Sequence, residues 1–210
     1  MKKSVVREYF ESLVIAVILA LFVRTWVFQA FKIPTGSMEP NLLVGDHLIV
    51  NKMIFAPTVS GLERAILPDR AIRRGDILVF KYPKDPERDF IKRVIGLPGD
   101  KVELHRKKVY VNGQPLDEPY AHFLEPPSTG GPPHVDDVRE EYGPVTVPSS
   151  QYFMMGDNRD NSEDSRYWGF MPASYVKGQA LFIYFSIDET KPLADLLGTI
   201  QWSRLLNRVR

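Results

Sequence analysis

The sequence predicts a mainly β protein that carries a single transmembrane helix at its N-terminus. Near the start of the chain, an apolar stretch reaches the length of a bilayer core. Beyond it, short runs rich in valine, isoleucine, leucine and aromatic residues alternate with turn signals, a pattern typical of β-strands. Glycine (14) and proline (17) are frequent among the 210 residues, which favours a turn-rich β protein over a helical bundle.

The overall composition excludes several classes of protein. Lysine and arginine together number 27, and aspartate and glutamate 26, so the net charge is +1. A protein that binds a nucleic-acid duplex usually carries a basic excess, and no nucleic-acid partner is therefore expected. Cysteine is absent, which removes disulfides, thiolate catalysis and cysteine-based zinc sites.

Residues 12–31 are predicted to form a membrane anchor. Twenty residues make a helix of about 30 Å, the thickness of a bilayer core, and Arg24 is the only charge among them. A cleaved signal peptide is the alternative, but Phe28 stands where the processing motif needs a small residue. Three basic residues precede the span, against two close to its other end, Arg24 and Lys32, which favours a cytoplasmic tail at residues 1–11 and a domain outside the cytoplasm.

The β-like runs are predicted to build one domain over residues 32–192, a twisted antiparallel sheet. Proline followed by glycine at Pro98 and Gly99 predicts a type II turn. Asn112 followed by Gly113 is a strong hairpin signal. The strands are expected at residues 42–55, 76–82, 90–95, 101–104, 108–111, 151–155 and 176–185.

Two segments depart from the strand pattern. Residues 117–148 are rich in proline and glycine, and we expect a loop-rich insertion without a chemical role. Residues 193–210 place leucine and isoleucine at helical spacing, which predicts an amphipathic C-terminal helix. This helix could dock on the β domain or lie on the membrane surface beside the anchor.

Ser37 is the first candidate for chemistry. It lies in the run I-P-T-G-S-M-E-P at residues 33–40, just past the apolar stretch. The prolines and glycine of this run can hold a hydroxyl at a fixed angle with backbone amides exposed beside it. The Ser37 amide and the Thr35 hydroxyl could then bind the oxyanion of a tetrahedral intermediate.

Lys92 is the second candidate, and it lies in the strand-like run at residues 90–95. Alternation gives each face of this strand one basic residue among apolar ones, Lys92 on one face and Arg93 on the other. At least one charge is therefore expected to approach the interior. A desolvated lysine can lose its proton and an arginine cannot, so Lys92 is the better base for Ser37.

Five blocks of the chain occur together in one known family. They are the single anchor, residues 33–40 followed by Gly45-Asp46, R-G-D-I-L-V-F at 74–80, I-K-R-V-I-G-L-P-G-D at 91–100, and G-D-N-R-D-N-S-E-D-S-R at 156–166. In these blocks the chain resembles the bacterial type I signal peptidases. These are membrane-bound serine proteases with a Ser/Lys dyad, and they remove signal peptides from exported preproteins.

The resemblance implies a role for each matching residue. Ser37 aligns with the nucleophile, Lys92 with the general base, and Thr35 with the hydroxyl that completes the oxyanion hole. Ser162 aligns with the hydroxyl that orients the lysine. Asp164 and Arg166 align with a supporting ion pair. Asn41 differs from the threonine that is usual in the family, and little consequence is expected.

The resemblance also implies a substrate and a location. Preproteins with small residues at the first and third positions before the cut are the expected substrates, bound as an added strand. Candidate walls of the substrate pockets are Ile33, Met38, Leu42 and Ile91. The implied location is the bacterial inner membrane, in contact with lipid and close to the secretion translocon.

Several other interpretations compete. The acidic loop at 157–166 could suggest calcium, but the ligand spacing is wrong for a known calcium loop, and no metal or other cofactor is expected. His47 follows Gly45-Asp46 and could suggest a Ser-His-Asp triad, but it is expected to be structural. A related peptidase, a self-cleaving repressor, or a β protein that binds exported chains without cutting them are the alternative functions.

Overall fold

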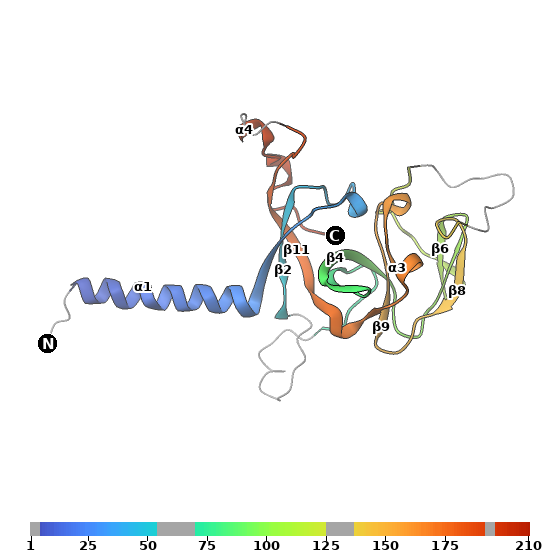
Figure 1. Ribbon diagram of the computed structural model, residues 1–210, viewed down its shortest axis with the longest axis horizontal. Coiled ribbons are helices and arrows are strands. Elements are labelled where there is room, and N and C mark those ends of the chain that lie inside the picture. Colours follow the sequence, from blue (N-terminus) through green and yellow to red (C-terminus); the bar gives the residue numbers. More distant parts are fainter. Residues whose placement is uncertain (1–4, 54–69, 125–136, 192–195) are drawn as a thin grey trace.

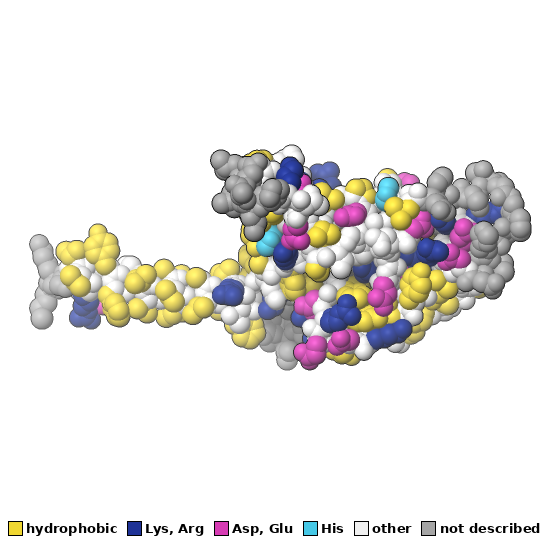
Figure 2. All heavy atoms as spheres, turned by 45° about the horizontal axis from the view of Figure 1, so that its top comes forward, with side chains coloured by type: hydrophobic (Ala, Val, Ile, Leu, Met, Phe, Trp, Pro, Cys, Tyr) yellow, Lys and Arg dark blue, Asp and Glu magenta, His cyan; other side chains and the backbone are white. Residues whose placement is uncertain are grey.

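The computed structural model describes residues 5–53, 70–124, 137–191 and 196–210. The first element is helix α1 (Val5–Phe22), and a π-helical turn, η1 (Val23–Val27), continues it. Figure 1 shows α1 projecting away from the β domain. None of its side chains is buried, and Figure 2 shows them as a largely apolar rod. Together the two elements are long and apolar enough to cross a membrane.

The end of the predicted anchor is wrong. The helical segment ends at Val27, and residues 28–31 belong to strand β1 (Phe28–Lys32). This strand pairs with β2 (Asp46–Asn51), with Phe28 opposite Asn51 and Lys32 opposite His47. The pairing satisfies the backbone polar groups of β1 that face β2, outside the helix. Hydropathy alone cannot distinguish an apolar strand from the last turn of an apolar helix.

A seven-stranded antiparallel sheet forms the first half of the domain. Its order is β1-β2-β11-β3-β4-β9-β10. The strands not yet given are β3 (Ile77–Tyr82), β4 (Asp85–Gly96), β9 (Gln151–Met155), β10 (Met171–Pro172) and β11 (Val176–Ser186). The predicted strands at 76–82, 90–95, 151–155 and 176–185 are confirmed. The strand predicted at 42–55 is confirmed over β2 among the described residues 42–53, and residues 54–55 lie outside the described residues.

A four-stranded sheet of order β7-β6-β5-β8 forms the second half. Its strands are β5 (Lys101–His105), β6 (Lys108–Val111), β7 (Gln114–Pro115) and β8 (Tyr142–Thr146). Both predicted turns are present: Gly99 has a φ of +88°, and Asn112 and Gly113 have φ of 54° and 76°. β8 lies inside the expected loop-rich insertion, so that segment is partly a strand. Its central residues 125–136 lie outside the described residues.

The predicted continuous helix at 193–210 is wrong. The tail contains one short helix, α4 (Leu196–Thr199), and a 3₁₀ turn, η6 (Trp202–Arg204); residues 192–195 lie outside the described residues. The rest runs along β11, where the amides of Leu206 and Val209 donate to Ile183 and Leu181. β3 pairs only with the first residues of β11. The tail therefore forms hydrogen bonds with the backbone groups in the later part of β11 that β3 does not reach.

The remaining described elements are helix α3 (Ser165–Trp168) and three 3₁₀ turns. The turns are η2 (Gly36–Met38), η4 (Arg159–Asn161) and η5 (Ala173–Tyr175). Two of them, η2 and η4, lie in the segments that carry the candidate site. The buried apolar side chains of the described residues form three clusters. One packs on the first sheet and includes Met38 of η2, one lies around Phe80 and Trp168, and one combines strands of both sheets.

Candidate active site

Ser37 lies in a loop that is closed at its neck by backbone hydrogen bonds. The Ile33 amide donates to the Asp46 carbonyl over 2.8 Å, and the Gly45 amide donates to the Ile33 carbonyl over 3.0 Å. Between these ends the chain forms the 3₁₀ turn η2, which contains Ser37. The Ser37 residue is only 7% exposed. The loop therefore presents a nearly buried hydroxyl to the neighbouring strand β4.

Lys92 reaches this hydroxyl from the middle of β4. Its Nζ lies 2.5 Å from Ser37 Oγ, and the lysine is 3% exposed. The Phe90 ring, on the same strand, has its centroid 5.2 Å from Nζ. The expectation that at least one charge of this strand approaches the interior is confirmed, and Arg93 is buried as well, at 2% exposure. The two principal candidate residues, 55 positions apart, are thus in direct contact.

The surroundings of Lys92 favour its neutral form. Burial lowers the pKa of Lys92 from 10.5 to about 8, although the charges of Asp164, Glu163 and Asp157 act in the opposite direction. With a pKa of about 8, about one amine in ten is neutral at pH 7, against about one in three thousand at the ordinary value. A neutral amine in contact with a hydroxyl can act as a general base.

An open cavity of about 400 Å³ lies beside the dyad. Ser37, Lys92, Thr35 and Ile91 are among its lining residues, together with the charged side chains of Arg88, Asp89 and Glu163 on its rim. The Thr35 side chain is exposed to this cavity. The arrangement leaves room for an extended chain to reach the Ser37 hydroxyl.

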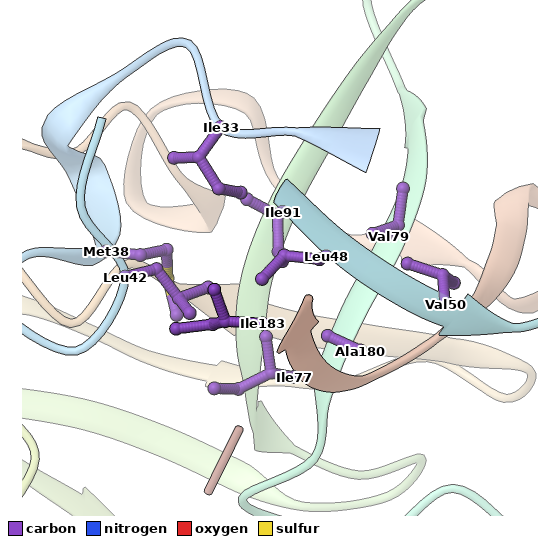
Figure 3. Close-up of a cluster of buried hydrophobic side chains, with 10 residues drawn as sticks. All are labelled: Ile33, Met38, Leu42, Leu48, Val50, Ile77, Val79, Ile91, Ala180 and Ile183. Carbon is purple, nitrogen blue, oxygen red and sulfur yellow. The ribbon is translucent and has the colours of Figure 1, made fainter. Parts of the chain in front are cut away.

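The other pocket candidates lie behind this wall. Ile33, Met38 and Leu42 are 2% exposed or less, and they belong to the same buried cluster as Ile91. Figure 3 shows Met38 and Leu42 next to Ile183, and Ile33 close to Ile91. Of the four, only Ile91 lines the cavity as the structure describes it. The role of the four as substrate-pocket walls stays a prediction.

Comparison with known proteins places this geometry in a family. The sequence profile of the signal peptidases, peptidase S26, matches residues 6–185. The chain belongs to this signal peptidase family. It is a serine endopeptidase, and its N-terminal apolar helix is compatible with a membrane anchor.

Two individual relatives agree with this assignment, and one solved structure is also similar. Signal peptidase I of Pseudomonas aeruginosa is 35% identical, with 90% of this chain and 76% of the relative covered. Probable signal peptidase I-2 of Synechocystis is 40% identical, with 90% and 77% covered. The crystal structure of a signal peptidase I from Enterococcus faecalis is 32% identical with a TM-score of 0.42, and covers 52% of this chain and 97% of its own.

Asn158 donates hydrogen bonds to the two backbone carbonyls that flank the Ser37 side chain, those of Gly36 and Ser37. Its amide donates to the Ser37 carbonyl over 3.1 Å, and its side-chain Nδ2 donates to the Gly36 carbonyl over 3.0 Å. Sequence reasoning missed this residue, although it lies in the G-D-N-R-D-N-S-E-D-S-R block. Its effect on Ser37 depends on a contact across 122 positions of the chain, which no local pattern indicates.

Ser162 is buried next to the same loop. A side chain at Gly156 would place its Cβ 2.3 Å from Ser162 Oγ and 2.4 Å from the Ser37 carbonyl oxygen. The absence of a side chain at Gly156 therefore lets Ser162 approach the nucleophile loop. The role of Ser162 in orienting Lys92 stays a prediction.

Asp164 and Arg166 form the expected ion pair. Arg166 donates to both carboxylate oxygens of Asp164, each over 2.8 Å, and both side chains are almost fully buried. Burial alone would raise the pKa of Asp164, but the charge and hydrogen bonds of Arg166 hold it below its ordinary value. The Gly156 amide also donates to Asp164, which links the pair to the segment beside Ser37.

A second buried ion pair was not foreseen. Arg93 donates to both oxygens of Asp157, over 2.7 and 2.6 Å. Asp157 also accepts a 2.8 Å hydrogen bond from the side chain of Asn41, the position that differs from the family's usual threonine. The pair thus connects the strand that carries Lys92 with the loop that carries Ser37.

Proposed function

We propose that this protein is a membrane-anchored peptidase that removes signal peptides from exported preproteins, with Ser37 as nucleophile and Lys92 as general base. The observation that carries the proposal is the 2.5 Å contact between two nearly buried groups, a hydroxyl and an amine. Nucleophilic catalysis by serine requires a base within hydrogen-bond reach. Family membership and the relatives named signal peptidase I support the choice of substrate.

In the first half of the reaction, the neutral Lys92 amine takes the proton of Ser37 as Oγ attacks the scissile carbonyl carbon. The resulting oxyanion is bound by the Ser37 amide and the Thr35 hydroxyl. The Lys92 ammonium then donates a proton to the leaving amine of the mature protein. The signal peptide remains attached to Ser37 as an ester.

In the second half, water hydrolyses this ester. The leaving amine has departed, so Lys92 is neutral again and can take a proton from the attacking water. Ser162 would hold the amine in the required direction, and the pair of Asp164 and Arg166 would hold the segment that carries Ser162. Collapse of the second tetrahedral intermediate returns the proton to Ser37 and releases the signal peptide.

The substrate would bind in an extended conformation along the cavity, with small residues at the first and third positions before the cut. The buried apolar cluster of Ile33, Met38, Leu42 and Ile91 supports shallow pockets of methyl size, because larger side chains would overpack it. Enlarging alanine to leucine at either substrate position is expected to abolish cleavage, measured with otherwise identical preproteins. Efficient processing of the leucine substrates would contradict the pocket assignment.

The anchor would bring the site to the membrane surface. Ser37 lies ten residues after Val27, where the helical segment ends, and ten residues span at most about 35 Å. A signal peptide inserted in the bilayer emerges within this reach. We therefore place the helix in the bacterial inner membrane, with a cytoplasmic N-terminus, the domain on the outer face, and the secretion translocon close by.

The function can be tested with the whole chain in detergent micelles and a preprotein substrate. The wild type is expected to release a mature protein of the correct size, whereas Ser37→Ala and Lys92→Ala are expected to be inactive. Lys101→Ala is the matched control, because Lys101 is an exposed lysine of the second sheet. Cleavage by Ser37→Ala at the wild-type rate would exclude Ser37 as the nucleophile, whereas a wild type that binds the preprotein without cleaving it would favour a binding function.

A further inference from the structure

The loop that carries Ser37 is held from outside by a residue near the end of the chain. Asp46 closes the neck of this loop and is fully buried. Arg204, 158 positions later, donates from Nε to Asp46 Oδ1 over 2.9 Å and from Nη2 to Oδ2 over 2.5 Å. A carboxylate with no exposure needs such a partner, because an unpaired buried charge is strongly unfavourable.

Arg204 also contacts the body of the loop. Its Nη2 donates to the Asn41 carbonyl over 3.0 Å. The Asn41 side chain in turn donates to Asp157, which pairs with Arg93, the neighbour of Lys92 on β4. The Arg204 guanidinium therefore holds the loop at two points. One is Asp46 at the neck, and the other is Asn41, which connects the loop to β4, the strand of the proposed base.

The tail that carries Arg204 is itself held in place. It pairs with β11 through the amides of Leu206 and Val209, and Arg93 Nη2 donates to the Arg210 carbonyl over 2.9 Å. The Arg204 side chain is only 17% exposed. The family profile matches residues 6–185, so this tail lies outside the matched part of the chain.

We propose that Arg204 is a positioning residue for catalysis, and that the C-terminal tail completes the active site by clamping the loop of Ser37 against β4. This inference rests on the proposed roles of Ser37 and Lys92. Displacing a reacting group by about 1 Å can cost on the order of a hundred-fold in rate. A loop that loses the contacts of Arg204 with the Asp46 carboxylate and with the Asn41 carbonyl is expected to permit a displacement of this size.

The test separates positioning from a purely structural role. Arg204→Ala leaves the Asp46 carboxylate without its cationic partner, although it still accepts from the Ser186 hydroxyl and the Leu43 amide. Both the melting temperature and kcat are therefore expected to fall, kcat by about ten- to a hundred-fold at temperatures well below melting. Adding Asp46→Asn removes the orphaned charge. The double variant is therefore expected to recover most of the melting temperature while its kcat stays low, since the Asn41 carbonyl still lacks its donor.

Arg208→Ala is the matched control, because Arg208 is an exposed arginine of the same tail. It is expected to leave kcat unchanged. The inference is overturned if Arg204→Ala keeps kcat within about two-fold of the wild type, or if the double variant regains kcat together with stability. Failure of the wild type to cleave any preprotein would instead contradict the proposed function. This outcome differs from the two outcomes that overturn the role of Arg204.

Discussion

The two faces of strand β4 bury neighbouring cations in different surroundings. Arg93 faces a carboxylate and forms two hydrogen bonds with Asp157, whereas the closest polar contact of Lys92 is the Ser37 hydroxyl. Burial lowers the pKa of Lys92 to about 8, while arginine stays charged under all ordinary conditions. A buried cation with a carboxylate partner is thus suited to supporting structure, and one facing a hydroxyl is suited to the proposed role of a base.

The largest effect is expected when both faces of β4 carry an arginine. Lys92→Arg retains the positive charge but removes the ability to act as a base. The cleavage rate is expected to fall by about 10²- to 10⁴-fold, the usual contribution of general-base catalysis, or below detection. The measurement is kcat/KM on a preprotein. A variant retaining near wild-type kcat/KM would show that charge, rather than proton transfer, is what Lys92 contributes.

Removing the cation from the other face is expected to act on stability. Arg93→Ala leaves Asp157 buried without its partner, and the free energy of unfolding should fall by about 3–5 kcal/mol. The melting temperature of the whole chain in micelles measures this effect. Val109→Ala, in the apolar core of the second sheet, is a useful comparison, because it should lower stability without changing the rate of the folded enzyme. An unchanged melting temperature in Arg93→Ala would argue against a structural pair.

Removing the cation of Lys92 should raise the free energy of unfolding, whereas removing Arg93 should lower it. Its folded pKa of about 8 lies below the ordinary 10.5, so the unfolded chain binds more protons between these pH values. Burial of Lys92 therefore costs stability below about pH 8, and this cost fades as the pH approaches 10.5. Lys92→Met should raise stability at pH 7 by up to about 3 kcal/mol while abolishing activity. A lower melting temperature at pH 7 would contradict this sign.

Local patterns in the sequence predicted the parts of the fold that depend on local properties. Strand alternation identified β4 and predicted that at least one of its two cations would approach the interior, and turn chemistry identified the hairpin at Asn112-Gly113. The prediction failed where distant segments decide the structure. Pairing with β2 converts residues 28–31 into a strand, and hydrogen bonds to β11 hold Leu206 to Val209, at the end of the predicted C-terminal helix, outside a helix.

In the candidate site, too, local sequence patterns predicted some residues, and contacts between distant segments determine the others. Ser37 and Lys92 could be predicted because backbone-restricting neighbours and strand alternation mark them locally. Asn158, the pair of Arg93 with Asp157, and the clamp of Arg204 on Asp46 could not be predicted. Each of these depends on a contact between segments separated by 64 to 158 positions. The exact form of such contacts is set by tertiary packing, which single-sequence periodicity does not contain.

The most direct test of the account is the ionisation of the Lys92 side chain. In the whole chain labelled with ¹⁵N-lysine, the Nζ signal that disappears in Lys92→Met can be followed as the pH is changed. The account predicts a midpoint of about 8, caused by burial. A midpoint near the ordinary 10.5 would contradict it, because almost no neutral amine would then be present at neutral pH to activate Ser37.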